Sequence, residues 1–232
     1  MKTKNLTLIL TAFLLIGFTA CNKKTGSVSN ANMETKTDSV AVALGQYYGK
    51  NISQQFSGLN PELIAKGIIE GFNDADVKVY DTPEATNAAI SGYLQEEKAR
   101  VAETNKAEGE AFLAKNSKKN GIIVTESGLQ YEVIKEGDGE KPTANNTVKV
   151  DYTGTTIDGK VFDSSVQRGQ PASFPVKGVI KGWTEGLQLM TVGSKYKFYI
   201  PSDLAYGERG SGAKIGPNAT LIFEVELLEI VK

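Results

Sequence analysis

The chain carries two kinds of hydrophobic pattern, and one replaces the other near its middle. Between residues 38 and 94, apolar positions recur every three to four residues, which is the spacing of one face of an α-helix. After Gly121, apolar and polar residues alternate instead, as they do in strands that are buried on one side. The change predicts a helical region followed by a region built mainly of β-strands.

Two short helices are predicted first. One has Thr37 or Asp38 as its N-cap, and its apolar positions lie four residues apart at Val40, Leu44, Tyr48, Ile52 and Phe56. The next starts at Asn60-Pro61, an N-cap followed by proline at the first helical position, and its buried stripe is predicted to be Leu63, Ile64, Ile68 and Phe72.

A long third helix is predicted from Thr82 to about Lys118. Thr82-Pro83-Glu84 repeats the start signal, and no proline follows until Pro142. The helix would be roughly 50 Å long, and over residues 95–110 it offers little apolar surface besides Val101. Such a polar helix is typical of a solvated connection between domains. The apolar faces of the three helices are narrow and would form only a small core in one chain, which favours pairing with a second copy. A self-contained three-helix domain is the alternative.

The second half predicts an antiparallel sheet. Alternating runs occupy residues 128–134, 147–152, 195–200 and 221–227, and Asp158-Gly159 is a hairpin turn signal. The helical candidate in this half is Lys181 to Met190. We therefore expect an α+β protein whose C-terminal sheet forms a half-barrel wrapped on one short helix.

The first twenty residues form a secretory signal pattern. Lys2 and Lys4 precede an apolar run that ends in small residues and is too short for a comfortable membrane span. Cys21, the single cysteine, follows directly and resembles the acceptor of a bacterial lipoprotein signal, which predicts a lipid-anchored protein of the bacterial cell envelope, facing the periplasm or at the outer membrane. A chance free thiol is the alternative. Residues 21–36 are polar and predict a flexible tether.

Charge and composition exclude several functions. The formal net charge is −1, and removing residues 1–20 deletes two lysines, which leaves 24 bases against 27 acids, or −3. No basic surface for nucleic acid is expected from this balance. With no histidine and one cysteine, the chain has few nucleophiles or metal ligands, so we expect no metal and no cofactor. Any chemistry should depend on shape and on the removal of water.

Aromatic residues gather among glycine turns between residues 150 and 223. They occur in Tyr152-Thr153-Gly154, Val161-Phe162-Asp163, Val179-Ile180-Lys181-Gly182-Trp183 and Ala205-Tyr206-Gly207. Each ring by itself is more often core than site, but together they predict an apolar slot with few polar groups. The glycine-rich segment 207–214 lacks the Gly-Lys-Ser/Thr ending of a phosphate loop, and we interpret it as a flap over the slot.

In order and spacing these motifs resemble the FKBP-type peptidyl-prolyl cis-trans isomerase family. The resemblance covers about Gly121 to Lys232. The N-terminal half is similar to the macrophage infectivity potentiator (Mip) type within that family. This similarity implies a helical dimerisation domain at residues 37–81, a connecting helix at 82–120 and an isomerase domain at 121–232.

The resemblance also implies the site. Trp183 would form the floor of the pocket, and the Ile180 N–H and the Tyr206 hydroxyl would hold carbonyls beside the proline, with Asp163 next to the rotating carbonyl. The structural alternative is that Asp163 is a turn residue whose carboxylate caps its own backbone. The implied catalytic residues are Tyr152, Phe162, Asp163, Ile180, Trp183 and Tyr206, and the implied substrate-binding residues are Val179, Phe223, Arg168 and Ile215.

The expected function is acceleration of prolyl isomerisation in exported proteins, with chaperone action on unfolded or proline-containing chains by a homodimer. The chain departs from the family pattern at Ala172, where an aromatic residue is common, and at Gly216, where proline is frequent. These departures leave a non-enzymatic binding module as the alternative. A purely structural lipoprotein would not explain the clustered pocket residues.

Overall fold

The computed structural model describes residues 33–231, except residues 57 and 74–78. The predicted signal peptide, Cys21 and most of the predicted tether lie outside the described residues. The chain divides into two compact units after Lys50. None of the described helices combines the length and apolar composition needed to cross a membrane.

Helix α1 (Lys36–Gln55) begins with a reciprocal capping box. The Thr35 N–H donates to Asp38 Oδ2 at 2.8 Å, and the Asp38 N–H donates to Thr35 Oγ1 at 3.1 Å. The prediction that Thr37 or Asp38 caps this helix was therefore wrong. Thr35 is the cap, and Asp38 is the acid at the third helical position that completes the pair.

The start signals of the next two helices are confirmed. Helix α2 (Pro61–Phe72) has Asn60 as its N-cap, and the Asn60 side chain accepts the Glu62 N–H at 2.8 Å. Helix α3 (Pro83–Asn116) has Thr82 as its N-cap, which accepts the Ala85 N–H at 3.1 Å. In both helices proline occupies a position whose N–H would have no intrahelical acceptor.

The apolar stripes of the short helices are largely exposed in the part of the chain that the structure describes. Helix α2 contains no buried residue, and Phe72 is 88% exposed, so the prediction of a buried α2 stripe was wrong for one copy of the chain. On α1, Val40, Leu44 and Tyr48 are each more than half exposed. An amphipathic face is buried only where another element covers it.

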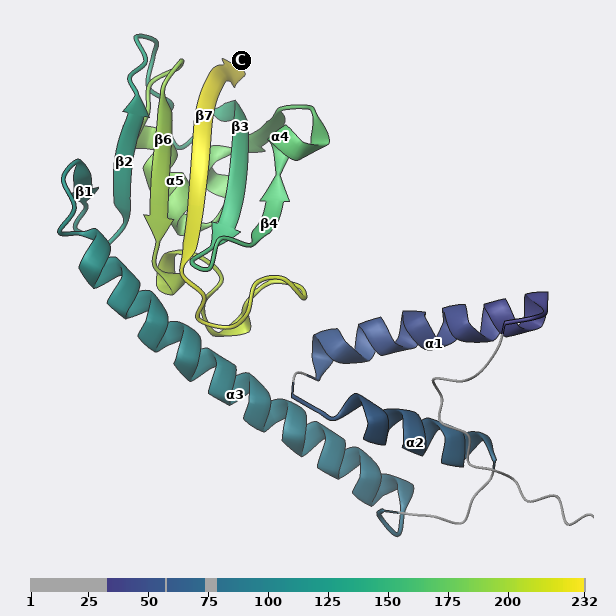
Figure 1. Ribbon diagram of the computed structural model, residues 1–232. Helices are drawn as coiled ribbons and strands as arrows, with labels where there is room; N and C mark the ends of the chain where they lie inside the picture. The colour runs from purple at the N-terminus through teal and green to yellow at the C-terminus, as the bar shows by residue number, and fades with distance from the viewer. Residues whose placement is uncertain (1–32, 57, 74–78, 232) are drawn as a thin grey trace, which may run out of the picture. The chain divides into compact units, whose positions relative to one another are not determined.

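The C-terminal domain is one antiparallel sheet (Figure 1). Its strand order is β1-β2-β6-β7-β3-β4, with β5 paired to β3. The mixed architecture confirms the predicted α+β class. The strands are β1 (Ile122–Val124), β2 (Gln130–Lys135), β3 (Thr147–Thr156), β4 (Val161–Ser164), β5 (Ala172–Pro175), β6 (Lys195–Ile200) and β7 (Leu221–Val231).

Helix α5 (Lys181–Leu189) lies behind the sheet in Figure 1, close to the predicted bounds. Gly182 and Gly186 face β6, and a Cβ at Gly186 would lie 2.7 Å from the Phe198 ring. The two glycines are one helical turn apart, so the backbone of α5 packs directly on strand side chains. The remaining short helices are α4 (Ser165–Arg168), η2 (Val176–Gly178), η3 (Ser202–Leu204) and η4 (Gly207–Arg209).

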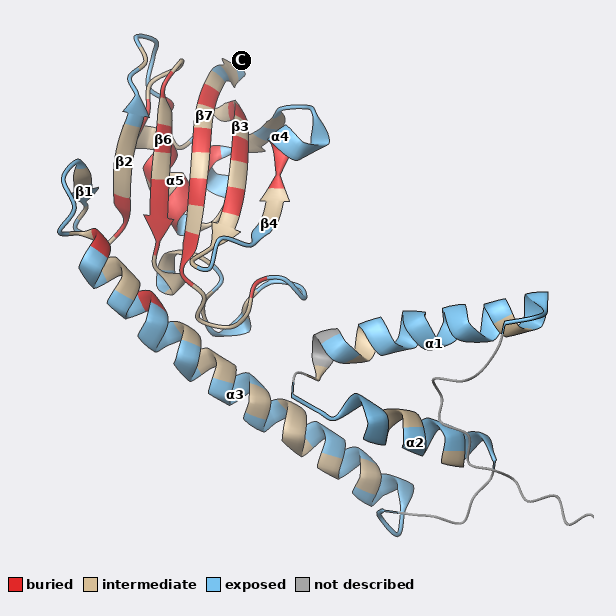
Figure 2. Ribbon diagram, in the orientation of Figure 1, coloured by how far each residue is buried: buried red, intermediate tan, exposed pale blue. Residues whose placement is uncertain are grey.

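The core lies between α5 and the inner face of the sheet. Along β3 and β7, buried residues alternate with half-buried ones, which Figure 2 shows as alternating bands. Tyr152 is paired with Val225 and Gly154 with Phe223, so the inward positions of the two strands lie side by side. This register brings the rings of Tyr152 and Phe223 to the same end of the core.

The C-terminal half of α3 packs against this domain rather than standing in solvent. Gly109 and Asn116 are buried, and the Phe112 ring lies 6.0 Å from the Tyr199 ring. Gln130 joins the two parts, because its Nε2 donates to the Leu113 carbonyl at 3.0 Å and its Oε1 accepts from Asn116 Nδ2 at 3.0 Å. The expectation of a solvated connection does not hold for this half of the helix.

Candidate functional site

One cleft of about 850 Å³ opens in the C-terminal domain. It brings together every residue predicted for the pocket except Arg168, which lines a smaller neighbouring cavity of about 230 Å³. The predicted residues around the main cleft are Tyr152, Phe162, Asp163, Val179, Ile180, Trp183, Tyr206, Ile215 and Phe223. Residues more than sixty positions apart in the sequence thus share one opening.

Several elements of the domain supply the apolar lining. Tyr152 comes from β3, Phe162 from β4 and Phe223 from β7. Ile180 immediately precedes α5, and Trp183 lies in the first turn of that helix. The start of α5 and the ring-bearing strands therefore line the same cleft.

Trp183 forms the centre of an aromatic box. It is only 4% exposed, and its ring meets those of Tyr152, Phe223 and Phe174 edge-to-face, at centroid distances of 5.2, 5.2 and 5.6 Å. The Phe162 ring meets the Phe223 ring in the same way at 5.3 Å. Edge-to-face contacts are favourable pairings of aromatic quadrupoles, so they hold the floor of the cleft in one arrangement.

Gly154 allows these rings to come together. A Cβ at this position would lie 2.6 Å from the Phe162 ring and 2.7 Å from the Phe223 ring. Real Cβ atoms do not approach ring carbons so closely, so a side chain here would displace a wall of the cleft. This contact explains why glycine follows Tyr152-Thr153 in the sequence.

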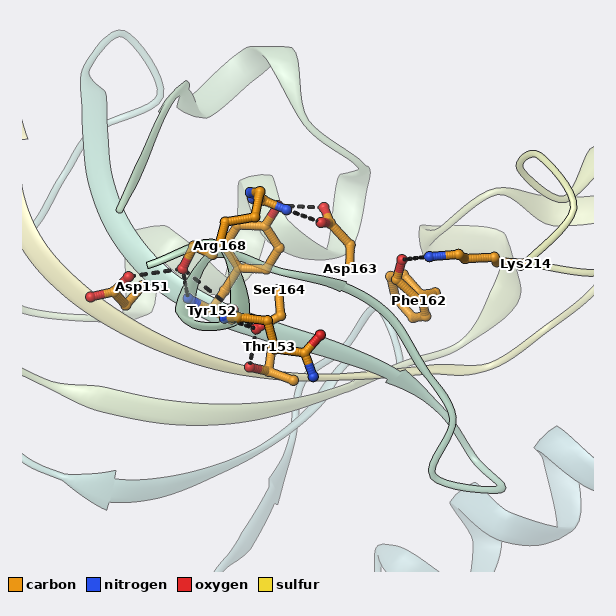
Figure 3. A network of polar contacts seen from close by, with 10 residues as sticks. Asp151, Tyr152, Thr153, Phe162, Asp163, Ser164, Arg168 and Lys214 are labelled. Carbon is orange, nitrogen blue, oxygen red and sulfur yellow. Dashed lines mark hydrogen bonds and ion pairs between the residues drawn. The ribbon is translucent and has the colours of Figure 1, made fainter. Parts of the chain in front are cut away.

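A polar network borders the box on one side (Figure 3). The Tyr152 hydroxyl donates to Asp163 Oδ2, and Arg168 forms an ion pair with Asp163 Oδ1. Arg168 Nη2 also donates to the Tyr152 hydroxyl oxygen at 3.0 Å. Arg168 therefore lies outside the main cleft but contacts two of the residues that line it.

The network determines the charge state of its members. Burial by itself would raise the pKa of Asp163, but the hydrogen bonds from Tyr152 and Arg168 outweigh it and hold this pKa below the usual range. Burial, together with the neighbouring Asp163, raises the pKa of Tyr152. Burial is also the main cause of the raised pKa of Tyr206. At neutral pH the site thus holds one carboxylate and two neutral phenols.

Several donors of cleft-lining residues have no acceptor among the described residues, and the buried indole Nε1 of Trp183 is one of them. The Ile180 carbonyl accepts the N–H groups of Trp183 and Thr184 at 2.9 and 3.0 Å, but the N–H of Ile180 itself is unpaired in the described part of the chain. The Tyr206 hydroxyl is likewise unpaired there, and Tyr206 is 39% exposed. Both groups are available to a carbonyl that enters the cleft.

Sequence reasoning missed part of the lining. Phe174 belongs to the box and lies two residues after Ala172 on β5, so the alternation of the strand was a signal that could have identified it. Ser211, Gly212, Ala213 and Lys214 also line the cleft, as expected for a flap. Lys214 Nζ donates to the Phe162 carbonyl at 3.1 Å, so the segment reaches across to β4.

Comparison with known protein families gives two matches that together cover most of the chain. A family described as FKBP-type peptidyl-prolyl cis-trans isomerase matches residues 138–228. A family described as the domain amino terminal to FKBP-type peptidyl-prolyl isomerase matches residues 37–133.

Individual relatives match over nearly their full length. Outer membrane protein MIP of Legionella longbeachae is 44% identical over 208 residues, covering 87% of this chain and 88% of that protein. FKBP-type peptidyl-prolyl cis-trans isomerase FkpA of Aeromonas hydrophila is 40% identical over 252 residues, covering 97% and 93%. The crystal structure of FkpA from Escherichia coli matches with a TM-score of 0.65 at 36% identity, covering 86% of this chain and 98% of that one.

Proposed function

The chain belongs to the FKBP-type peptidyl-prolyl cis-trans isomerases, and from this premise we propose that the cleft floored by Trp183 is its catalytic site. The observation that carries the proposal is that two unpaired donors, the Ile180 N–H and the Tyr206 hydroxyl, belong to residues of a cleft lined by aromatic rings. Such a site can orient a peptide by its carbonyls while surrounding the proline with apolar groups.

Prolyl isomerisation needs no nucleophile. Rotation breaks the conjugation of the amide against a barrier of about 18–20 kcal/mol, and the twisted amide has less charge separation than the planar one. An apolar cleft therefore favours the twisted form, and it also removes water that stabilises the planar amide oxygen. A 10³-fold acceleration requires only about 4 kcal/mol of such preference.

The polar groups have separate roles in this proposal. The Ile180 N–H and the Tyr206 hydroxyl bind the carbonyls that flank the proline, and Asp163 lies beside the rotating carbonyl. Arg168 does not touch the peptide bond and instead orients Asp163 and Tyr152, consistent with its place outside the main cleft. Val179, Phe223 and Ile215 contact the side chains of the bound segment.

We propose that the protein acts in the bacterial cell envelope, anchored by lipid on Cys21. The support is the leader pattern before Cys21 and the name of one relative, an outer membrane protein. Radiolabelled palmitate should appear on the wild-type protein, and Cys21→Ser should abolish this label. An unlabelled wild-type protein would contradict the anchor.

We also propose that the chain forms a homodimer through its N-terminal helices. The large exposed side chains of α1 and α2, among them Leu44, Tyr48, Leu63 and Phe72, provide the apolar surface for it. A dimer would present two catalytic clefts to one unfolded chain and so raise the effective concentration of the second cleft. This geometry favours chaperone action alongside isomerisation.

The test of the site is the refolding of a protein whose slow phase is limited by proline. Wild-type protein at substoichiometric dose should accelerate this phase, whereas a mere binder would change only yield or aggregation. Trp183→Ala should remove the acceleration. Tyr131→Ala truncates a half-buried ring outside the cleft and should retain it. Undiminished catalysis by Trp183→Ala would falsify the assignment.

A further inference from the structure

One wall of the cleft belongs to the segment between Gly207 and Thr220. The segment is closed at its base, where the Asn218 N–H donates to the Gly207 carbonyl at 2.8 Å. Ser211 and Ile215 exchange backbone hydrogen bonds of 2.8 and 3.2 Å, and Ile215 is buried against the cleft. The position of Ile215 therefore depends on what holds the residues that follow it.

Helix α3 holds those residues. Asn105 Nδ2 donates to the Pro217 carbonyl at 2.8 Å, and the Asn105 side chain is partly buried by this contact. In the opposite direction, Asn218 Nδ2 donates to the Ala102 carbonyl at 3.4 Å. Two side-chain amides thus join the helix and the segment. Asn105 of the helix bonds to the backbone of the segment, and Asn218 of the segment bonds to the backbone of the helix.

The packing around these amides is tight. A Cβ at Gly216 would lie 2.9 Å from Asn105 Nδ2 and 3.5 Å from Val101. One helical turn further along, Gly109 is buried against Thr220, and a Cβ there would collide with the Thr220 side chain. Positions 101, 105 and 109 are four residues apart and share one face of the helix, so the contact is continuous along α3.

The backbone of the segment is adapted to this contact. Asn218 has φ +55°, and among the described residues it is the non-glycine residue with positive φ. Asparagine tolerates this conformation better than most residues, and here it places the side-chain amide next to the helix. The conformation and the contact with Ala102 thus support each other.

We propose that Asn105 is a positioning residue of the isomerase: through Pro217 it holds Ile215 in the wall of the cleft, so that α3 forms part of the substrate-binding structure. The proposal rests on the assignment of the cleft as the catalytic site. Asn105 does not touch the peptide and acts through the segment 215–218.

The expected kinetic effect follows from what Ile215 contacts. An apolar wall binds the side chains of the substrate equally in the planar and twisted states, so loosening it weakens both complexes by the same amount. The loss should appear in KM and leave kcat nearly unchanged.

The first experiment uses full-length Asn105→Ala and a proline-containing tetrapeptide. Because alanine is the stronger helix former, the substitution does not weaken α3 itself. We expect KM to rise about three- to tenfold, the effect of one lost hydrogen bond, with kcat within about twofold of wild type. Trp183 is the only tryptophan, so its fluorescence should report a matching rise in Kd during peptide titration. Lys106→Ala, an exposed position on the same helix, is the control and should change neither constant.

The second experiment tests the contact itself. Gly216→Ala should raise KM by pushing against Asn105, and adding it to Asn105→Ala should cause no further rise, because the space is then free. Additive effects, or a wild-type KM in both single variants, overturn the proposal. Trp183→Ala separates the two hypotheses: if it abolishes activity while Asn105→Ala has no effect, the cleft assignment stands and the positioning role fails. If Trp183→Ala leaves activity intact, the cleft assignment fails.

Discussion

The C-terminal domain and the N-terminal helices both have regular hydrophobic patterns, but among the described residues of one chain only the C-terminal domain buries its apolar face. Along β3 and β7 the inward residues are buried, whereas Leu63 and Phe72 of α2 remain exposed. Periodicity thus determines which face of an element is apolar and leaves open what covers that face. In the C-terminal domain the chain covers it, and for the helices we propose a second copy.

The largest difference between the two regions should appear when a core residue of the C-terminal domain is substituted. Phe198 is 1% exposed and packs against Gly186 of α5, so Phe198→Ala should lower the free energy of unfolding by about 3–5 kcal/mol. Urea unfolding followed by Trp183 fluorescence measures the loss. The change should not depend on protein concentration, and a concentration-dependent loss would contradict the view that this core is complete in one chain.

A smaller effect is expected where the core becomes the cleft. Gly154→Ala places a methyl group against the Phe162 and Phe223 rings and should destabilise the domain by about 1–3 kcal/mol, with loss of isomerase activity. Gly159→Ala is a control that strains a positive φ in an open turn without touching the rings. It should cost stability but leave activity per folded molecule unchanged. Equal activity losses in the two variants would contradict the role of Gly154.

Substitutions in the N-terminal helices should change the dissociation constant of the proposed dimer rather than the free energy of unfolding. Phe72→Ala removes a side chain that is 88% exposed in the single chain, and it should weaken the proposed dimer at least about tenfold, as expected for a large apolar side chain buried between copies. Sedimentation equilibrium measures the dissociation constant. Lys66→Ala on the same helix is the control. A wild-type protein that is monomeric at every concentration would remove the dimer hypothesis.

The smallest effect concerns the pH dependence contributed by Asp163. Its pKa is lower in the folded protein than in the unfolded chain, so its contribution to stability is fully present above the unfolded value of about 3.9 and disappears as the pH falls through the folded value. Asp163 is partly exposed, so the effect should be modest. Wild type should be more stable than Asp163→Asn at pH 7, and the difference should shrink in acid. A difference that grows in acid would contradict the network.

Some of the site was predictable because its signals are local. Glycine turns and aromatic spacing predicted an apolar slot, the family resemblance implied most of the residues that line the cleft, and Asn60-Pro61 and Thr82-Pro83 correctly marked two helix starts. Phe174 was missed, although it lies two residues after Ala172 on the same face of β5. Arg168 was predicted to bind the substrate, and only the tertiary structure shows that it lies beside the main cleft, in contact with Tyr152 and Asp163.

The packing of α3 against the C-terminal domain could not be predicted from hydrophobic periodicity. Sequence periodicity detects apolar side chains, but beside the Phe112 ring this contact is made largely by amides and by a glycine that carries no side chain at all. Asn105, Gly109 and Asn116 resemble the polar surface around them until their partners are known. A helix that is polar by pattern can therefore still be packed.

The amino-acid sequence by itself determined the two regions, two of the helix starts, the alternation of the strands and most of the rings from which the cleft is built, because these features depend on neighbours a few residues apart. Only the tertiary structure decided that Asn105 meets the Pro217 carbonyl 112 residues away, and that Arg168 stands beside the cleft rather than in it. Contacts between distant residues depend on how the elements pack, and hydrogen bonds between polar groups leave no periodic trace in the chain that makes them.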